Sequence, residues 1–151
     1  MLILDTNHLR VLQTAGSTGE RLANRLRNDG REPVTTVINV HEVINGWLSE
    51  INKAKTAQGK VPGYSHLLDL LEYFSNWTIL PFDAAAATQF DALKRVSALR
   101  KCGTMDLQIA AIALCHNATV LTRNLADFQS IPNLHVEDWL LEDPLEMPPD
   151  K

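Results

Sequence analysis

The sequence predicts a three-layer α/β domain in which helices cover both faces of a short central parallel sheet. Short apolar runs alternate along the chain with longer segments of helical periodicity, as in folds built from successive strand–helix units. The length of 151 residues suits one domain and is enough to bury a core without a disulfide or a structural metal.

Short apolar runs predict the strands. MLIL at residues 1–4 is apolar throughout, which is typical of a parallel strand buried on both faces. Further strands are expected at 33–37 and 77–80, an apolar strand at 119–122, and a short strand near 135–136. Helical segments separate these runs, so we expect parallel pairing.

Capping residues and apolar faces predict the helices between the strands. Ser17 and Glu20 have the spacing of a capping box, and Gly30 is a suitable helix end. Asp83 can cap the helix that follows it. Residues 56–63, TAQGKVPG, are rich in turn residues and predict a loop. The expected helices begin just after residue 5 and cover 18–29, about 39–55, 65–75, 84–99 and 104–116.

Charge is distributed unevenly along the chain. There are 14 Lys and Arg against 18 Asp and Glu, a net charge of −4. Residues 137–151 hold six of the acids and one of the bases, or −5, which leaves +1 for residues 1–136. The acidic character therefore does not exclude a polyanionic partner for most of the chain. We divide the chain into a domain at 1–139 and an acidic, proline-containing tail at 140–151.

Several functional classes lack their signals. No apolar run reaches the ~18–20 residues of a membrane span, and the first residues lack the basic segment of a signal peptide. Cys102 and Cys115 are too few for a disulfide framework or a zinc site. No P-loop or dinucleotide-binding glycine motif occurs. We expect a cytoplasmic protein with reduced thiols and no membrane partner.

Four carboxylates lie close to the ends of predicted strands. Asp5 directly follows the first strand, and Glu42 lies on the first turn of the helix after the second. Asp106 lies on the first turn of a later helix, and Asp127 lies five residues after the next strand. Because ligands of parallel sheets bind at the carboxyl ends of the strands, these side chains can converge on one site.

Four clustered carboxylates would require a cation. At ~4 Å and an effective dielectric constant of ~20, each pair of like charges costs about 4 kcal/mol. Oxygen ligands without nearby Cys or His favour Mg²⁺ or Mn²⁺. Such ions can activate a water and stabilise the leaving oxygen of a phosphodiester. We expect Asp5→Asn to abolish cleavage while leaving the fold intact, or even to stabilise the metal-free protein by relieving the repulsion.

Each acid also has a structural interpretation. Glu42 stands three residues after Asn39, the spacing of a helix cap and its partner. Asp106 could stabilise a helix N-terminus, and Asp127 could belong to a turn. Asp5 is the hardest to explain in this way, because it directly follows a buried strand.

Five segments around these acids occur in a characteristic order: LDTNHL (4–9), TTVINVHEV (35–43), MDLQIAAIAL (105–114), TVLTRNLADF (119–128) and LHVEDW (134–139). Together they resemble the PIN-domain ribonucleases, and among these the VapC-type toxins of bacterial toxin–antitoxin pairs. The resemblance implies a three-layer α/β/α fold and cleavage of RNA, with tRNA or rRNA as substrate and Mg²⁺ (or Mn²⁺) as cofactor. It also implies a homodimer and a cognate antitoxin protein that inhibits the site.

The resemblance assigns roles by position. The implied catalytic and metal-binding acids are Asp5, Glu42, Asp106 and Asp127. The implied supporting polar residues are Thr6, Asn7, Thr122 and Asn124. Arg123 is the basic side chain nearest the expected site in sequence and is our candidate RNA contact. The five histidines lack metal-ligand spacing, although His8 is close enough to Asp5 to contact a substrate.

Two other functions share part of this pattern. A haloacid-dehalogenase-like phosphatase also starts with an acid after its first strand, but it needs a second acid where this chain has Asn7. A catalytically inert PIN-like module that binds RNA or protein would keep the fold. The presence of all four acids argues against this module, because a degenerate site usually loses one of them.

Overall fold

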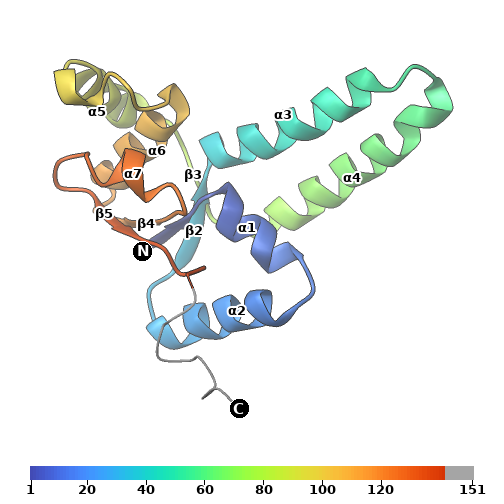
Figure 1. Ribbon diagram of the computed structural model, residues 1–151, viewed down its shortest axis with the longest axis horizontal. Coiled ribbons are helices and arrows are strands. Elements are labelled where there is room, and N and C mark those ends of the chain that lie inside the picture. Colours follow the sequence, from blue (N-terminus) through green and yellow to red (C-terminus); the bar gives the residue numbers. More distant parts are fainter. Residues whose placement is uncertain (142–151) are drawn as a thin grey trace, which may run out of the picture.

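A computed structural model describes residues 1–141 of the chain. Figure 1 shows a sheet with helices on both sides, from which two long helices, α3 and α4, project together. In the described residues the sheet has five strands, all paired in parallel, in the order β3-β2-β1-β4-β5. The strands are β1 (Leu2–Leu4), β2 (Pro33–Thr36), β3 (Ile79–Leu80), β4 (Thr119–Leu121) and β5 (His135–Glu137). Each predicted strand is confirmed, as is the three-layer α/β/α class.

The predicted helices are also present, with changes at their ends. Gly16 precedes α2 and its carbonyl accepts the N–H of Glu20, so the predicted capping box at Ser17 is wrong. Gly30 ends this helix with a positive φ of 82°, as predicted. The helices are α1 (Thr6–Gln13), α2 (Ser17–Asp29), α3 (Val37–Lys53), α4 (Ala57–Ser75), α5 (Ala84–Lys94), the 3₁₀ turn Ser97–Leu99, α6 (Thr104–Cys115) and α7 (Leu125–Phe128).

The predicted loop at 56–63 is wrong, because these residues form the first turns of α4. The hydroxyl of Thr56 accepts the N–H of Gly59 at 3.0 Å and so caps the helix, which continues through Pro62. A Cβ at Gly63 would clash with Cγ1 of Ile51 on α3. The glycine therefore allows two helices to pack closely and does not form a turn.

The core has two halves, one on each face of the sheet. Successive side chains of β1 alternate between them, as in any strand. Ile3 belongs to the half covered by α5 and α6, whereas Leu2 and Leu4 belong to the half covered by α1, α2 and α4. Leu140 packs against the second half, and residues 142–151 of the predicted tail lie outside the described residues.

The strand order places a crevice at the centre of the sheet. From β1 the chain adds β2 and β3 on one side, and later β4 and β5 on the other. The side on which new strands are added therefore changes between β1 and β4. Parallel sheets bind ligands at such a point, at the carboxyl ends of the strands. Among residues 1–141, no helix is both long and apolar enough to cross a membrane.

The contact between α3 and α4 can be tested with two glycines. Gly63→Ala should cost about 1 kcal/mol net, because the clash with Ile51 outweighs the gain in helix propensity. Gly46→Ala, at a position of α3 with open space around it, should instead gain about 0.5–1 kcal/mol. Urea unfolding of both variants measures the difference. Equal stabilisation by both substitutions would contradict the close approach of the two helices.

Candidate active site

A cavity of about 300 Å³ lies at the carboxyl ends of β1 and β4. Three of the four predicted acids line it, namely Asp5, Glu42 and Asp106. All four predicted supporting residues line it as well: Thr6, Asn7, Thr122 and Asn124. The residues come from both ends of the described chain, as the reversal of the strand order requires.

Asp5 links the end of β1 to the start of α1. It is the N-cap of α1, and its Oδ1 accepts the backbone N–H groups of Asn7 at 3.0 Å and His8 at 3.1 Å. The imidazole Nδ1 of His8 contacts the same oxygen at 3.0 Å. Three contacts therefore converge on Oδ1, and none of these three uses Oδ2.

The surroundings of Asp5 favour its charged form. Burial opposes ionisation, but hydrogen bonds from the His8 ring, the Thr122 side chain and the His8 backbone outweigh it, so the pKa of Asp5 is lowered. Asp5 is therefore negatively charged at neutral pH. Repulsion from the other acids does not dominate at this residue, in contrast to our expectation from the sequence.

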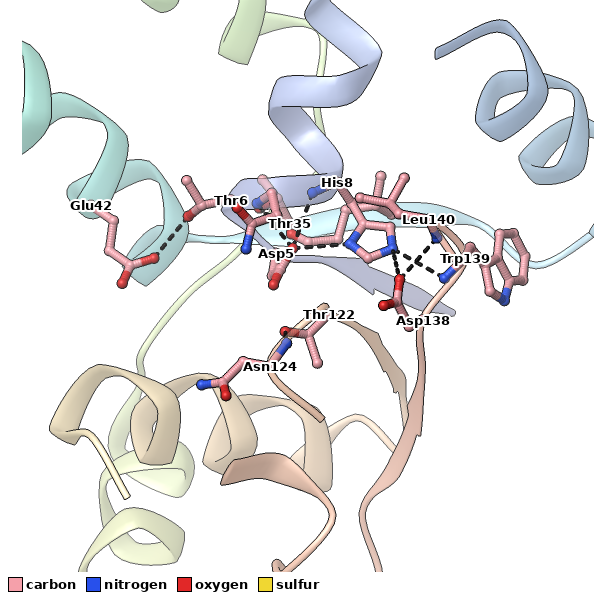
Figure 2. Close-up of polar contacts among 12 residues, drawn as sticks. Asp5, Thr6, His8, Thr35, Glu42, Thr122, Asn124, Asp138, Trp139 and Leu140 are labelled. Atoms are coloured by element: carbon pink, nitrogen blue, oxygen red, sulfur yellow. Dashed lines mark hydrogen bonds and ion pairs between the residues drawn. The ribbon is translucent and has the colours of Figure 1, made fainter. Parts of the chain in front are cut away.

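Glu42 is held by Thr6 and is not part of a helix cap. The cap of α3 is Thr36, whose hydroxyl accepts the N–H of Asn39 at 3.2 Å. The structural interpretation of the Asn39–Glu42 spacing is therefore wrong. The hydroxyl of Thr6 donates to Oε2 of Glu42 at 2.8 Å, which connects the first turn of α1 to α3 (Figure 2).

Asn124 connects the other two acids. Its Nδ2 donates to Oδ2 of Asp127 at 2.7 Å and lies 3.4 Å from Oδ2 of Asp106. Its backbone N–H donates to the hydroxyl of Thr122 at 3.0 Å. Asp127 does not itself line the cavity, and it is joined to a lining residue by the hydrogen bond from Asn124.

Asp106 carries the electrostatic cost of the cluster. Burial raises its pKa, and the charges of Asp127, Glu42 and Asp5 raise it further, to about 6. The charges of the other three acids therefore act on Asp106. Asp5 and Asp106 differ because hydrogen-bond donors surround Asp5, whereas the other charges near Asp106 are negative.

The donor set fits a hydrated divalent cation. In residues 1–141, no three Asp, Glu, His or Cys side chains lie close enough to ligate one ion together. Mg²⁺ commonly keeps several waters and binds through one or two carboxylates, so such a cage is not required. The buried Nδ2 of Asn39 also lines this region and has no hydrogen-bond partner among the described residues. A cation would neutralise the negative charge around Asp106, and one of its waters could accept a hydrogen bond from Nδ2 of Asn39.

Sequence reasoning missed some residues of the site and misplaced one. Arg10 lines the cavity, whereas the predicted RNA contact Arg123 is exposed and is not among the lining residues. Arg10 stands four residues after Thr6 and three after Asn7, so the helical period could have placed it near the cavity. Asn39, interpreted as a helix cap, also lines the cavity. His8 is fully buried, and its ring contacts the backbone N–H of Trp139, a residue 131 positions away in the sequence.

The chain matches one known family over most of its length. Residues 2–134 match the PIN domain family. Ribonuclease VapC2 from Rickettsia felis is 49% identical over 37 residues, which cover 24% of this chain and 28% of that protein. The matched segment thus spans little more than a quarter of this relative.

Two solved structures are similar over nearly the whole described chain. One is a crystal structure of VapBC2 from Rickettsia felis bound to a DNA fragment from their promoter, with 26% identity, a TM-score of 0.65, and coverage of 91% of this chain and 98% of that chain. The other is DNA-bound VapBC from Salmonella typhimurium, with 24% identity, a TM-score of 0.68, and coverage of 91% and 97%. This second likeness concerns the fold alone.

Asp106→Asn should stabilise the metal-free protein at pH 7.5 by about 1–2 kcal/mol, a value reduced for the partial exposure of the group. The folded-state pKa is raised to about 6, so the stability contributed by protonated Asp106 is present below its ordinary pKa of 3.8 and is lost as the pH rises through 6. Urea unfolding in EDTA should show the gain at pH 7.5 and a smaller one near pH 4.5.

Asp91, an exposed acid on α5, provides the matched control. Asp91→Asn should leave the stability unchanged at both pH values. The assignment of the repulsion to Asp106 would be wrong if Asp5→Asn gave the larger gain.

Proposed function

Because this chain belongs to the PIN domain family, we propose that it is a metal-dependent endoribonuclease and the toxin of a toxin–antitoxin pair. The observation that carries the proposal is the convergence of Asp5, Glu42 and Asp106 on one cavity at the reversal point of the sheet. The short match to a VapC2 ribonuclease supports the activity, and the likeness to VapBC structures supports the class of system.

Each acid has a distinct part in this proposal. Asp5 and Asp106 would hold Mg²⁺ or Mn²⁺ directly, since both line the cavity from opposite sides of the crevice. Glu42, fixed by Thr6, and Asp127, fixed by Asn124, would hold waters of the ion. When bound, the ion would supply the acidity that activates a water and the charge that stabilises the leaving oxygen.

The substrate in this proposal is RNA, with tRNA or rRNA as the class. Arg10 places a positive charge at the wall of the cavity, where it can contact a phosphate. Attack of water on phosphorus, in line with a departing 3′ oxygen, leaves a 5′-phosphate and a 3′-hydroxyl. Because the nucleophile in this proposal is water and not the 2′-hydroxyl of the RNA, a 2′,3′-cyclic phosphate is not expected.

A protein partner is the second part of the proposal. We propose a cognate antitoxin and a homodimer, acting in the cytoplasm. The two described cysteines are free thiols, which suits that compartment. The projecting α4 exposes Leu68 and Leu71, at 69% and 55%, and exposed apolar side chains of this size are typical of protein-binding surfaces.

One observation favours the alternative of an inert PIN-like module that binds RNA or protein. In the described part of the chain, the acids are too far apart for three of them to ligate one ion as they stand. Titration with Mn²⁺ distinguishes the two functions. Absence of binding at millimolar concentrations would favour the inert module.

The ribonuclease proposal predicts metal-dependent cleavage of purified tRNA or rRNA. We expect cleavage with Mg²⁺ or Mn²⁺, none in EDTA, and a rate at least about 100-fold lower for Asp5→Asn. Asn caps helices about as well as Asp, so this variant should remain folded, as circular dichroism can show. Asp91→Asn should cleave at the wild-type rate. Cleavage that persists in EDTA, or products with cyclic phosphate ends, would contradict the mechanism.

The support of Glu42 by Thr6 can be tested separately. Thr6→Val removes the donor to Oε2 at almost constant volume and should lower the cleavage rate about tenfold. Thr6→Ser keeps a hydroxyl at the same place and should retain most of the rate. If both variants cleave RNA equally fast, Thr6 does not hold Glu42 in the working geometry.

A further inference from the structure

His8 is a fully buried polar residue that faces the site on one side and the end of the described chain on the other. Its side chain is 0% exposed. Figure 2 shows its ring between Asp5 and the residues that follow β5. Nδ1 lies 3.0 Å from Oδ1 of Asp5, and Nε2 lies 3.3 Å from the backbone N of Trp139.

The contacts of His8 identify which ring nitrogen carries the proton. The backbone N–H of Trp139 can only donate, so Nε2 of His8 must accept. The proton then lies on Nδ1 and is donated to Oδ1 of Asp5. Asp138 does not change this assignment, because its Oδ1 is 3.7 Å from Nε2, too far for a hydrogen bond.

The segment that contacts Nε2 is itself fixed in place. Oδ1 of Asp138 accepts the N–H of Leu140 at 2.9 Å, which forms a local turn. The Trp139 ring is packed in the core, and its Nε1 donates to Glu137 at 2.6 Å. The guanidinium of Arg25 lies 4.2 Å from the centre of this ring. His8 therefore rests against a rigid support.

We propose that His8 is a positioning residue for Asp5 and that residues 138–140 act on the site through it. The inference rests on the proposed function, since it concerns a carboxylate that would bind the ion. Oδ1 already accepts three donors, so the ion would bind through Oδ2, and the Thr122 side chain also hydrogen-bonds to this carboxylate. Two of these donors belong to the helix backbone, and His8 Nδ1 is the one that depends on a side chain.

A purely structural role for His8 predicts a different outcome from a positioning role. In the structural case, any substitution would matter only through stability. In the positioning case, the ion affinity would depend on whether a donor faces Oδ1 of Asp5. Two variants separate these cases, because they lose the same contact to Trp139 and differ in the contact to Asp5.

The experiment compares His8→Asn with His8→Leu in Mn²⁺ titrations and in RNA cleavage. The amide nitrogen of Asn takes roughly the place of Nδ1 and keeps a donor to Asp5, whereas Leu removes it. We expect His8→Leu to bind Mn²⁺ about 10–100-fold more weakly than wild type, and His8→Asn to stay within about threefold. His116, exposed beyond the far end of α6, provides the control His116→Leu, which should match wild type.

His8→Asn and His8→Leu should lower the free energy of unfolding by similar amounts, as measured by urea unfolding. The Mn²⁺ titrations are performed under conditions in which each variant is folded. Wild-type Mn²⁺ affinity in folded His8→Leu would overturn the proposal. Equal loss of affinity in the Asn and Leu variants would also overturn it, because stability would then explain both.

Nuclear magnetic resonance of the metal-free wild-type protein separates this inference from the proposed function. The ¹⁵N signals of the His8 ring should show a proton on Nδ1 and a bare Nε2. The ¹³C carboxyl signal of Asp5 should shift in His8→Leu and remain close to wild type in His8→Asn. A proton on Nε2, or an unmoved Asp5 signal in both variants, would overturn the positioning role. If wild type neither binds Mn²⁺ nor cleaves RNA, the proposed function fails, while these spectra still decide the contact.

Discussion

The hydrogen bonds to one oxygen of Asp5 are the constraint on which the candidate site depends. Oδ1 receives two backbone donors from the start of α1 and the ring of His8, so it fixes the angle between β1 and α1. Because β1 is the central strand, every other acid is placed relative to this junction. Thr6, the next residue, extends the same junction to Glu42 on α3. A single carboxylate thus serves as helix cap, as attachment for a buried ring and as a candidate ligand.

The crevice combines two carboxylates whose environments oppose each other. Burial affects both Asp5 and Asp106, yet the pKa of the first is lowered and that of the second is raised. The difference arises from what surrounds them. Three donors converge on one oxygen of Asp5, whereas Asp106 has a longer 3.4 Å contact from Asn124 and the charges of the other acids nearby. A cation bound between them would be held by a preformed negative charge on one side. On the Asp106 side, the positive charge of the cation would reduce the repulsion among the acids.

The sequence predicted the fold class and the four acids because both depend on local pattern. The central strand β1 is a short apolar run, and each acid lies a few residues after a strand or within the first two turns of a helix. The helical start of α4 was missed because Gly63 looks like a turn residue until its contact with Ile51 is known. α7 has four residues, too few to show a helical period. The contact between His8 and Trp139 joins positions 131 residues apart, and no local pattern indicates such a pair.

This long separation has a consequence for the order in which the protein is made. Asp5 and α1 leave the ribosome early, but the N–H that supports His8 belongs to Trp139 and is synthesised after all five strands. Until then, Asp5 has its two backbone donors, but the His8 ring that provides the third donor lacks its contact with Trp139. On our proposal the product would attack RNA, and the messenger and ribosome that produce it consist of RNA. On the same proposal, the contact that supports His8 could form only after residue 139 has emerged, so the crevice would be completed late in synthesis.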